Sequence, residues 1–342
     1  MAELHLAQAA KTDDGRGLHA EERAWAGLVR THSLRLLGYI DHLRGNYQPA
    51  LDHYRHCRQA YRNVENPRYE SHTLLLSAET QRCLGDYARA KADYEQALDL
   101  VRGTGNLDME HLLLNNLGDV MTHLGCYDQA ESCLGEALAL ARRTCNQAAE
   151  ARVFEGLSRV ARHRGDQYLA ETYARQALSQ SNTSDRGWCL TTLANSLEAQ
   201  GRLSEAAATF AESIRWWGAH AETNAIVEAL AGLSRVALAR GALPDAVTHA
   251  EAIYHRLGSA LTIMEPLRAY LACWQAFQAA DDPRAEEVLW RASRLLAEQA
   301  ARIDDPLLRR SFLEQVAAHR EIMAAGALPV AASQFYSISH NG

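Results

Sequence analysis

The chain has 342 residues and a net charge of −7, with 47% hydrophobic and 23% charged residues. An acidic balance disfavours a nucleic-acid surface, which normally carries a basic patch, and no apolar run reaches the roughly 18 residues of a membrane span. The first twelve residues include Glu3, His5 and Lys11 but no hydrophobic core segment. We therefore expect a cytoplasmic protein without a signal peptide that contacts neither nucleic acid nor membrane directly.

Six glycines recur along the chain at a nearly constant spacing. The first four lie 40 residues apart, the fifth follows after 36 and the sixth after another 40: Gly45, Gly85, Gly125, Gly165, Gly201 and Gly241. Self-similarity at a fixed period of this size predicts an array of stacked repeats.

Similar residue types recur at fixed distances from each glycine. Alanine always stands five residues after it, and a small residue such as Gly118 or Ser158 stands seven before it. Apolar positions three and four residues apart predict two amphipathic helices per repeat, with the glycine ending the first helix. Close approach of the two helices needs the small residue and the alanine. A seventh, degenerate copy has Ala280 in the place of the glycine.

The two ends of the chain differ from its middle. Residues 304–306 (Asp-Asp-Pro) predict a helix start, followed by one helix over 307–324 that would cover the last hydrophobic face. We therefore divide the chain into an N-terminal cap or truncated repeat at 1–17, a repeat array at 18–303, a capping helix at 304–326 and a disordered tail at 327–342.

The repeat resembles the tetratricopeptide repeat over roughly residues 18–300. The resemblance rests on Leu-Gly at residues 37–38 and 117–118 and on the turn Gly-x-Tyr after Gly45, Gly85 and Gly125. It implies an all-α fold, a right-handed α-α superhelix of about seven helical hairpins plus a C-terminal capping helix. The family period is 34 residues, so the 40-residue period resembles long variants such as those of kinesin light chains. HEAT and armadillo repeats share that period but not the pattern of small residues.

Residues 305–314 carry a second resemblance, to the closing helix of tetratricopeptide arrays at the C-terminus of bacterial multidomain signalling ATPases and transcriptional regulators. The chain itself has no phosphate-binding loop motif. The resemblance implies a non-catalytic sensor or interaction array that would belong to a longer regulator. The alternatives are a free-standing adaptor of a defence or secretion complex and a peptide-pheromone receptor.

Residue types that carry chemistry are scattered. The seven cysteines are odd in number and include no close pair of metal-binding spacing. His53, His56 and Cys57 have a helical spacing that could hold a metal, but Cys57 occupies a packing position of the repeat. We therefore expect free thiols and neither metal, cofactor nor catalysis. Trp216 and Trp217 are expected to wedge between repeats.

A second stripe of each first helix lies opposite its packing stripe, at 13, 10, 6 and 3 residues before the glycine. In tetratricopeptide arrays this face lines the concave groove. Asparagine offers a donor and an acceptor, and arginine a planar fork for carboxylates. The candidate groove residues are Arg82, Asn115, Asp119, Arg152, Arg159, Arg162, Trp188, Asn195 and Arg235.

The arginines of this stripe indicate a protein or peptide partner that offers an acidic or C-terminal segment. The alternative is a solvated charged face on which Arg152 and Arg159 pair with Glu155. The stripe does not decide between binding in the groove and binding on the convex face.

Overall fold

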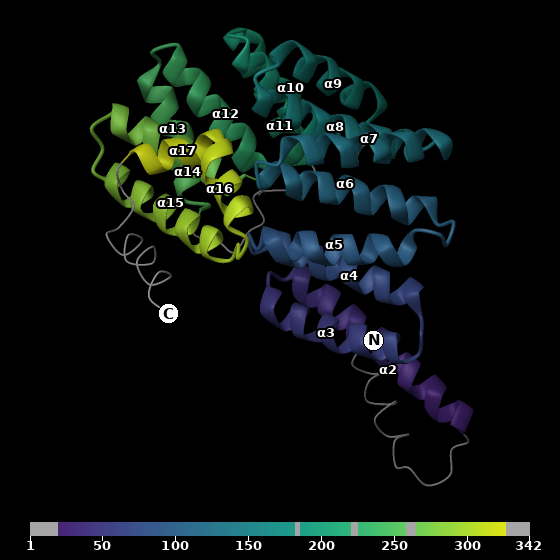
Figure 1. The fold of residues 1–342 in the computed structure, drawn as a ribbon. Coiled ribbons are helices and arrows are strands. Elements are labelled where there is room, and N and C mark those ends of the chain that lie inside the picture. The colour runs from purple at the N-terminus through teal and green to yellow at the C-terminus, as the bar shows by residue number, and fades with distance from the viewer. Residues whose placement is uncertain (1–19, 182–184, 220–224, 258–264, 326–342) are drawn as a thin grey trace. The chain divides into compact units, whose positions relative to one another are not determined.

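The computed structural model describes residues 20–181, 185–219, 225–257 and 265–325 (Figure 1). These ranges contain 16 helices and no strand, and 14 of the helices form seven consecutive hairpins. The predicted all-α solenoid of about seven hairpins is thereby confirmed. No helix within the described ranges is both long and apolar enough to cross a bilayer.

The chain divides into two compact units, residues 1–113 and 114–342, which we describe separately. In the first unit α2 (Ala20–Leu43) pairs with α3 (Tyr47–Asn63), and α4 (Pro67–Cys83) pairs with α5 (Tyr87–Val101). The division falls within α6 (Leu107–His123), which begins the third hairpin.

The second unit holds the rest of α6 and eleven further helices. Each hairpin from α8 onward packs on the next, as in a solenoid. The helices are α7 (Tyr127–Arg143), α8 (Gln147–Arg164), α9 (Gln167–Gln180), α10 (Arg186–Ala199), α11 (Leu203–Ala219), α12 (Ile226–Ala239), α13 (Leu243–Tyr254), α14 (Pro266–Ala279), α15 (Arg284–Ala301), α16 (Pro306–Gln315) and α17 (Ala317–Ala324).

The turn inside each hairpin is built by its glycine. All six repeat glycines adopt positive φ angles, between 71° and 87°, a conformation that costs little without a Cβ atom. In the seventh copy the left-handed residue is Asp281 (φ 51°), one position after the predicted Ala280. The predicted position was one residue too early, since the left-handed residue is the second of the turn here, as in the turn at 44–46. Aspartate tolerates left-handed backbone better than most residues.

The two helices of a hairpin touch at the predicted small residues. All six alanines that follow the glycines by five residues are fully buried. The side chain of Leu134 packs against Gly118, so close that a Cβ atom there would lie 2.7 Å from Leu134 Cγ. In the fourth hairpin the small residue is Ser158, whose hydroxyl donates to the Ala170 carbonyl at 2.7 Å. The repeat pattern in the sequence is therefore a pattern of helix contacts.

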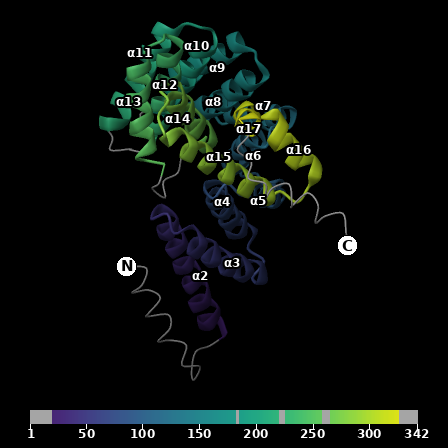
Figure 2. The ribbon, with the colours of Figure 1, turned by 90° about the vertical axis from the view of Figure 1, so that its left-hand side faces the viewer.

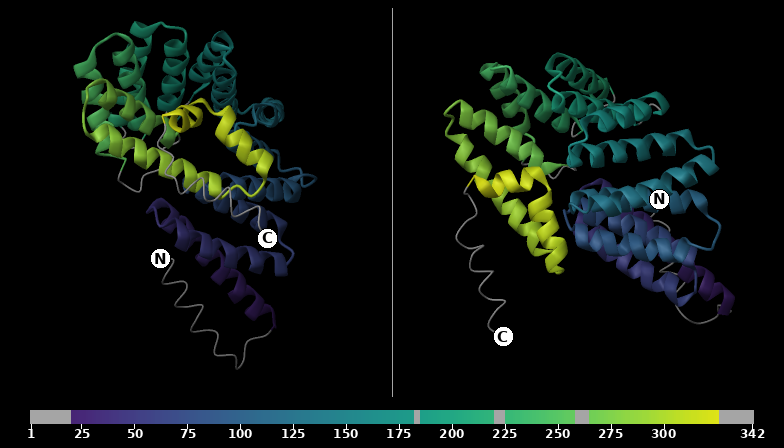
Figure 3. Two further views of the ribbon diagram at one scale, coloured as in Figure 1. Left: turned by 60° about the vertical axis from the view of Figure 1, so that its left-hand side comes forward. Right: turned by 45° about the horizontal axis from the view of Figure 1, so that its top comes forward.

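The C-terminal segment differs from its prediction. One helix over 307–324 was expected, but the chain forms α16 and α17, separated by the extended residue Val316 (φ −79°, ψ 118°). Phe312, Val316 and His319 of this segment are buried. Helix α17 packs against α14 and α15, and Figures 2 and 3 show it as the yellow segment beside these green helices. The predicted cap at 1–17 and tail at 327–342 lie outside the described residues.

Candidate protein-interaction face

The first helices of the second unit carry charged side chains that meet in one buried layer. We call this the ionic layer. It joins α6, α8, α10, α12 and the start of α14, and it consists of Asp119, Glu155, Arg159, Arg162, Glu198, Arg235, Glu265 and Arg268.

Arg159 links α8 to α6. Its guanidinium pairs with Asp119, and its Nε atom lies 3.1 Å from an oxygen of Glu155 one turn earlier. Glu155 also accepts a hydrogen bond from the Thr192 hydroxyl of α10, at 3.0 Å. Burial raises the pKa of Glu155; burial opposes the charge of Arg159, but Asp119 and Glu155 raise its pKa above the ordinary value. The guanidinium is thus held as a permanent cation inside the protein.

Glu265 is the acidic centre of the layer. Its carboxylate lies 3.3 Å from Arg162, 3.2 Å from Arg268 and 3.5 Å from His163. Burial opposes the charge of Glu265, but Arg162 leads the contacts that hold its pKa well below the usual range. Burial, with Arg162 beside it, lowers the pKa of His163 to about 4. The Glu265 carboxylate is therefore bound by the arginine cations of α8 and α14, Arg162 and Arg268.

Arg235 ties α12 to α10. It donates two hydrogen bonds to the Glu198 carboxylate, at 2.7 and 2.8 Å, and a third to the Asn195 side-chain oxygen, at 3.1 Å. The neighbouring Glu228 accepts from the backbone N–H of Glu265 at 2.7 Å, and burial next to Glu265 raises its pKa. Breaking a buried pair by removing one partner typically costs about 3–5 kcal/mol, so loss of a single charged side chain from the ionic layer should destabilise the protein.

The structure brings together five of the predicted groove residues: Asp119, Arg159, Arg162, Asn195 and Arg235. Arg152 and Arg159 were the two predicted partners of Glu155. Arg159 makes this contact, whereas Arg152 is exposed. Sequence reasoning missed Glu265 and Arg268, because the degenerate seventh repeat offered no glycine from which to count.

The remaining predicted residues lie elsewhere. Asn115 is half-buried and bonds its neighbour Asn116 at 3.4 Å. Trp188 is half-buried and packs edge-on against Trp217, with ring centroids 5.2 Å apart. Arg82 is half-buried in the first unit. Trp217 itself lies over Gly187, so it wedges between α10 and α11, within one hairpin.

The C-terminal hairpin of α16 and α17 reaches the turn between α6 and α7. The Tyr127 hydroxyl donates to the Gln315 carbonyl at 3.2 Å, and a Cβ atom on Gly125 would lie 2.7 Å from the Ser311 carbonyl oxygen. His319 of α17 is buried and lies 2.7 Å from the Phe312 carbonyl. Burial, with His123 and His163 nearby, lowers its pKa to about 4. This hairpin therefore brings His319 close to His163, which contacts Glu265 of the ionic layer.

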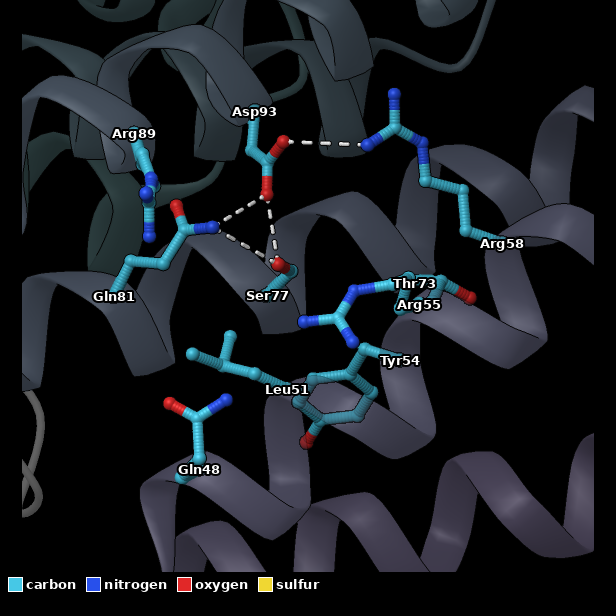
Figure 4. Close-up of a pocket in the computed structure, with 10 residues that line it drawn as sticks. All are labelled: Gln48, Leu51, Tyr54, Arg55, Arg58, Thr73, Ser77, Gln81, Arg89 and Asp93. Carbon is cyan, nitrogen blue, oxygen red and sulfur yellow. Dashed lines mark hydrogen bonds and ion pairs between the residues drawn. The ribbon is translucent and has the colours of Figure 1, made fainter.

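The first unit has a hollow of about 350 Å³, which we call the outer hollow (Figure 4). The sequence did not point to it, because most of its lining comes from second helices, whose exposed residues follow no repeat rule. Its lining residues come from α3, α4 and α5 and are Gln48, Leu51, Tyr54, Arg55, Arg58, Thr73, Ser77, Gln81, Arg89 and Asp93.

Cysteines and histidines do not assemble into a reactive centre. All seven cysteines are free, and burial raises the pKa of Cys57, Cys189 and Cys273 to about 12. Cys57 donates to the Thr31 carbonyl at 3.3 Å rather than pointing toward His53 or His56. Within the described ranges, no group of three or more Cys, His, Asp or Glu residues could hold a metal ion.

Comparison with solved structures identifies the architecture. The fold resembles a Rap conjugation gene regulator of plasmid pLS20 in complex with its Phr peptide, at 14% identity, 85% coverage of this chain and 80% of that one, with a TM-score of 0.67. It also resembles a Rap protein complexed with Competence and Sporulation Factor, at 16% identity, 87% and 76% coverage and a TM-score of 0.56.

A third similar structure is a signal transduction ATPase with a tetratricopeptide repeat sensor from Pyrococcus horikoshii. The identity is 11%, the TM-score 0.54, and the match covers 98% of this chain and 54% of that one. Identities this low show the fold alone. Comparison with curated protein sequences gives no match.

The sequence model of the tetratricopeptide repeat matches residues 30–103 and 109–182. The first range runs from within α2 to just past α5, the second spans α6–α9, and the hairpins that follow have the same helix–turn–helix architecture. Residues 30–103 and 109–182 are therefore tetratricopeptide repeats.

Proposed function

We propose that this chain is the non-catalytic protein- or peptide-binding array of a bacterial cytoplasmic signalling or transcriptional regulator. Tetratricopeptide repeats are interaction scaffolds, and no catalytic family is indicated. The likeness to an ATPase that carries a tetratricopeptide repeat sensor supports a sensor role, since the match covers 98% of this chain.

The observation that carries the proposal is the binding of Glu265 in the ionic layer. Two arginines and a histidine from α8 and α14 surround this carboxylate. The chain's own Glu265 thus indicates that these side chains of the second unit accept a carboxylate. An acidic or C-terminal segment of a partner would use the same chemistry, with Arg152 on α8 as an exposed first contact. Charge-assisted hydrogen bonds contribute about 1.5–3 kcal/mol each.

The test is a peptide-display screen against the purified chain, followed by affinity measurement with labelled peptides. We expect the enriched peptides to carry Asp, Glu or a free C-terminal carboxylate. Arg152→Glu should weaken their binding at least about tenfold, which corresponds to about 1.4 kcal/mol. Arg143→Glu is the matched control, because Arg143 is also exposed but lies on the second helix α7. Enrichment of uncharged peptides, or equal effects of both substitutions, would contradict the proposal.

A peptide receptor is the second candidate. It is favoured by the Rap regulator, which was solved with a bound peptide and matches 85% of this chain at a TM-score of 0.67. An antibody against the array, used on cells of the source organism, separates the candidates. A native protein much larger than 37.9 kDa supports the array of a longer regulator, whereas a band near that mass favours a receptor or a free-standing adaptor.

A further inference from the structure

The outer hollow lies on a different face from the predicted groove. Thr73, Ser77 and Gln81 line it from α4 at four-residue spacing. At 100° per residue these three positions fall opposite the inner stripe of α4, which includes Arg82. The rest of the lining belongs to the second helices α3 and α5. A ligand here would not enter the groove of the array.

The three arginines that line the hollow differ in how firmly they are held. Arg58 is committed: it bonds Gln96 and lies 3.6 Å from Asp93 and 3.9 Å from Glu70. Arg55 pairs with the exposed Asp52 at 2.9 Å, whereas Arg89 lies 3.4 Å from the buried Asp86 and also near Asp93. The exposed Arg55–Asp52 pair contributes little to stability, and the Arg89 side chain is itself 78% exposed, so both guanidiniums are available to a ligand.

The single carboxylate in the lining is already satisfied. Asp93 accepts hydrogen bonds from the Ser77 hydroxyl at 2.7 Å and from the Gln81 amide at 3.1 Å, and it pairs with Arg58 (Figure 4). This arrangement fixes α3, α4 and α5 around the hollow. Three arginines against one aspartate leave the lining with a formal charge of +2 (3 − 1), in a chain whose net charge is −7.

The shape of the hollow favours a peptide over a free anion. In Figure 4 Arg55 enters from the α3 side and Arg89 from the α5 side, with Leu51 and the ring of Tyr54 between and below them. A volume of about 350 Å³ is within the range of small ligand sites. An apolar floor between two cations suits a carboxylate side chain together with a neighbouring apolar side chain.

We propose that the outer hollow binds an acidic segment of a partner protein, with Arg55 and Arg89 clamping a carboxylate from opposite walls and Leu51 receiving the adjacent apolar side chain. The inference rests on the proposed protein-binding function but places a second anchor on the outer surface of the repeats.

The test follows the arginine Nε–Hε NMR signals of the full chain during titration with the hexapeptide Leu-Glu-Asp-Leu-Glu-Leu. We expect the signals of Arg55 and Arg89 to shift, and those of the exposed Arg44 and Arg240 to stay in place. The double substitution Arg55→Gln/Arg89→Gln should weaken binding at least about tenfold, or about 1.4 kcal/mol. The peptide in which Gln and Asn replace Glu and Asp should not bind.

Three results would overturn the inference. The first is a uniform shift of all exposed arginines, and the second is inorganic phosphate binding the same two arginines as tightly as the peptide does. The third is unchanged peptide affinity in Arg55→Gln/Arg89→Gln. If Arg152→Glu then abolishes peptide binding, the proposed function is supported and the binding site in the outer hollow is ruled out. If no acidic peptide binds anywhere, both proposals fail.

Discussion

At the scale of single residues, the repeat depends on the space between two helices. Where the small residue is glycine, as at Gly118, a leucine side chain fills the gap, and where it is serine, as at Ser158, a hydroxyl bridges to the facing carbonyl. Ser234 repeats this bridge to Ala246 at 3.1 Å. Serine at this position therefore replaces packing volume with a buried hydrogen bond.

Two glycine substitutions should have opposite effects on stability. Gly118→Ala places a Cβ atom 2.7 Å from Leu134 Cγ and 3.2 Å from the Ala130 carbonyl, and overpacking of this kind costs about 1–3 kcal/mol. Gly135→Ala, in the exposed middle of α7 with nothing within 4 Å, should stabilise by about 0.5–1 kcal/mol because alanine favours the helix. Urea denaturation measures both. A Gly118→Ala protein as stable as the wild type would show that the helices can separate at no cost.

Stability should fall as the pH is lowered from about 6.5 to about 4.5. His163 and His319 are buried with their pKa lowered to about 4, so the unfolded chain binds protons in this window that the folded chain does not. Their contribution is complete above about pH 6.5 and is lost as the pH falls toward about 4, at most about 3 kcal/mol for each histidine.

Denaturation at a series of pH values tests this effect. His32, His42, His72 and His249 also have lowered pKa values, so the comparison is between the wild type and His163→Gln/His319→Gln. The double variant should lose part of the pH slope between about 4.5 and about 6.5. An identical slope in both proteins would show that these two histidines do not cause the pH dependence.

At the scale of helices, local pattern predicted most of the architecture. Each hairpin depends on residues within one repeat period around its glycine, so the sequence alone indicates the six hairpins from α2 to α13. Long-range contacts follow no such rule. The break at Val316 has no proline or glycine beside it, and it occurs where Phe312 and His319 turn inward to pack on each other, with ring centroids 4.3 Å apart.

About half of the residues of the ionic layer could be predicted from the sequence. Counting from the glycines found the arginines of α8 and α12, because they occupy equivalent positions in their repeats. It also found Asp119 and Glu155, which pair with Arg159, but not Glu265, which precedes a helix whose repeat lacks the glycine. The expectation of a carboxylate at these arginines was chemically sound, but the carboxylate that the structure places there belongs to the same chain.

A disulfide should lock the C-terminal hairpin in place. Cys126 lies on the turn between α6 and α7, with its sulfur 3.7 Å from the Ser311 hydroxyl of α16. We expect the Ser311→Cys variant to form a disulfide between Cys126 and the introduced thiol on mild oxidation, which shifts mobility on a non-reducing gel and raises the melting temperature. Ser311→Cys/Cys126→Ser is the control. Failure to cross-link would mean that α16 does not stay at this turn in solution.

At the scale of the whole molecule, the array is built without cross-links among its described residues. All seven cysteines are free, and the fully buried residues are mainly alanine, leucine and aromatic side chains. Stability in such arrays is approximately a sum of terms for each repeat and for each interface between neighbours. This scaffold carries two groups of charged residues that differ in net charge. The ionic layer in the second unit is charge-balanced, and the outer hollow in the first unit is cationic.

The contact between α16 and the turn at Gly125 changes how the second unit should come apart. A linear array can fray from its last repeat, because each repeat touches only its neighbours. Here Ser311 contacts a residue 185 positions earlier in the chain, which closes the intervening hairpins into a loop. The C-terminal end cannot peel away without first opening that closure, so unfolding of these hairpins becomes a single cooperative event. Closing so long a loop is also entropically slow, and its formation should be the last step in folding of this unit.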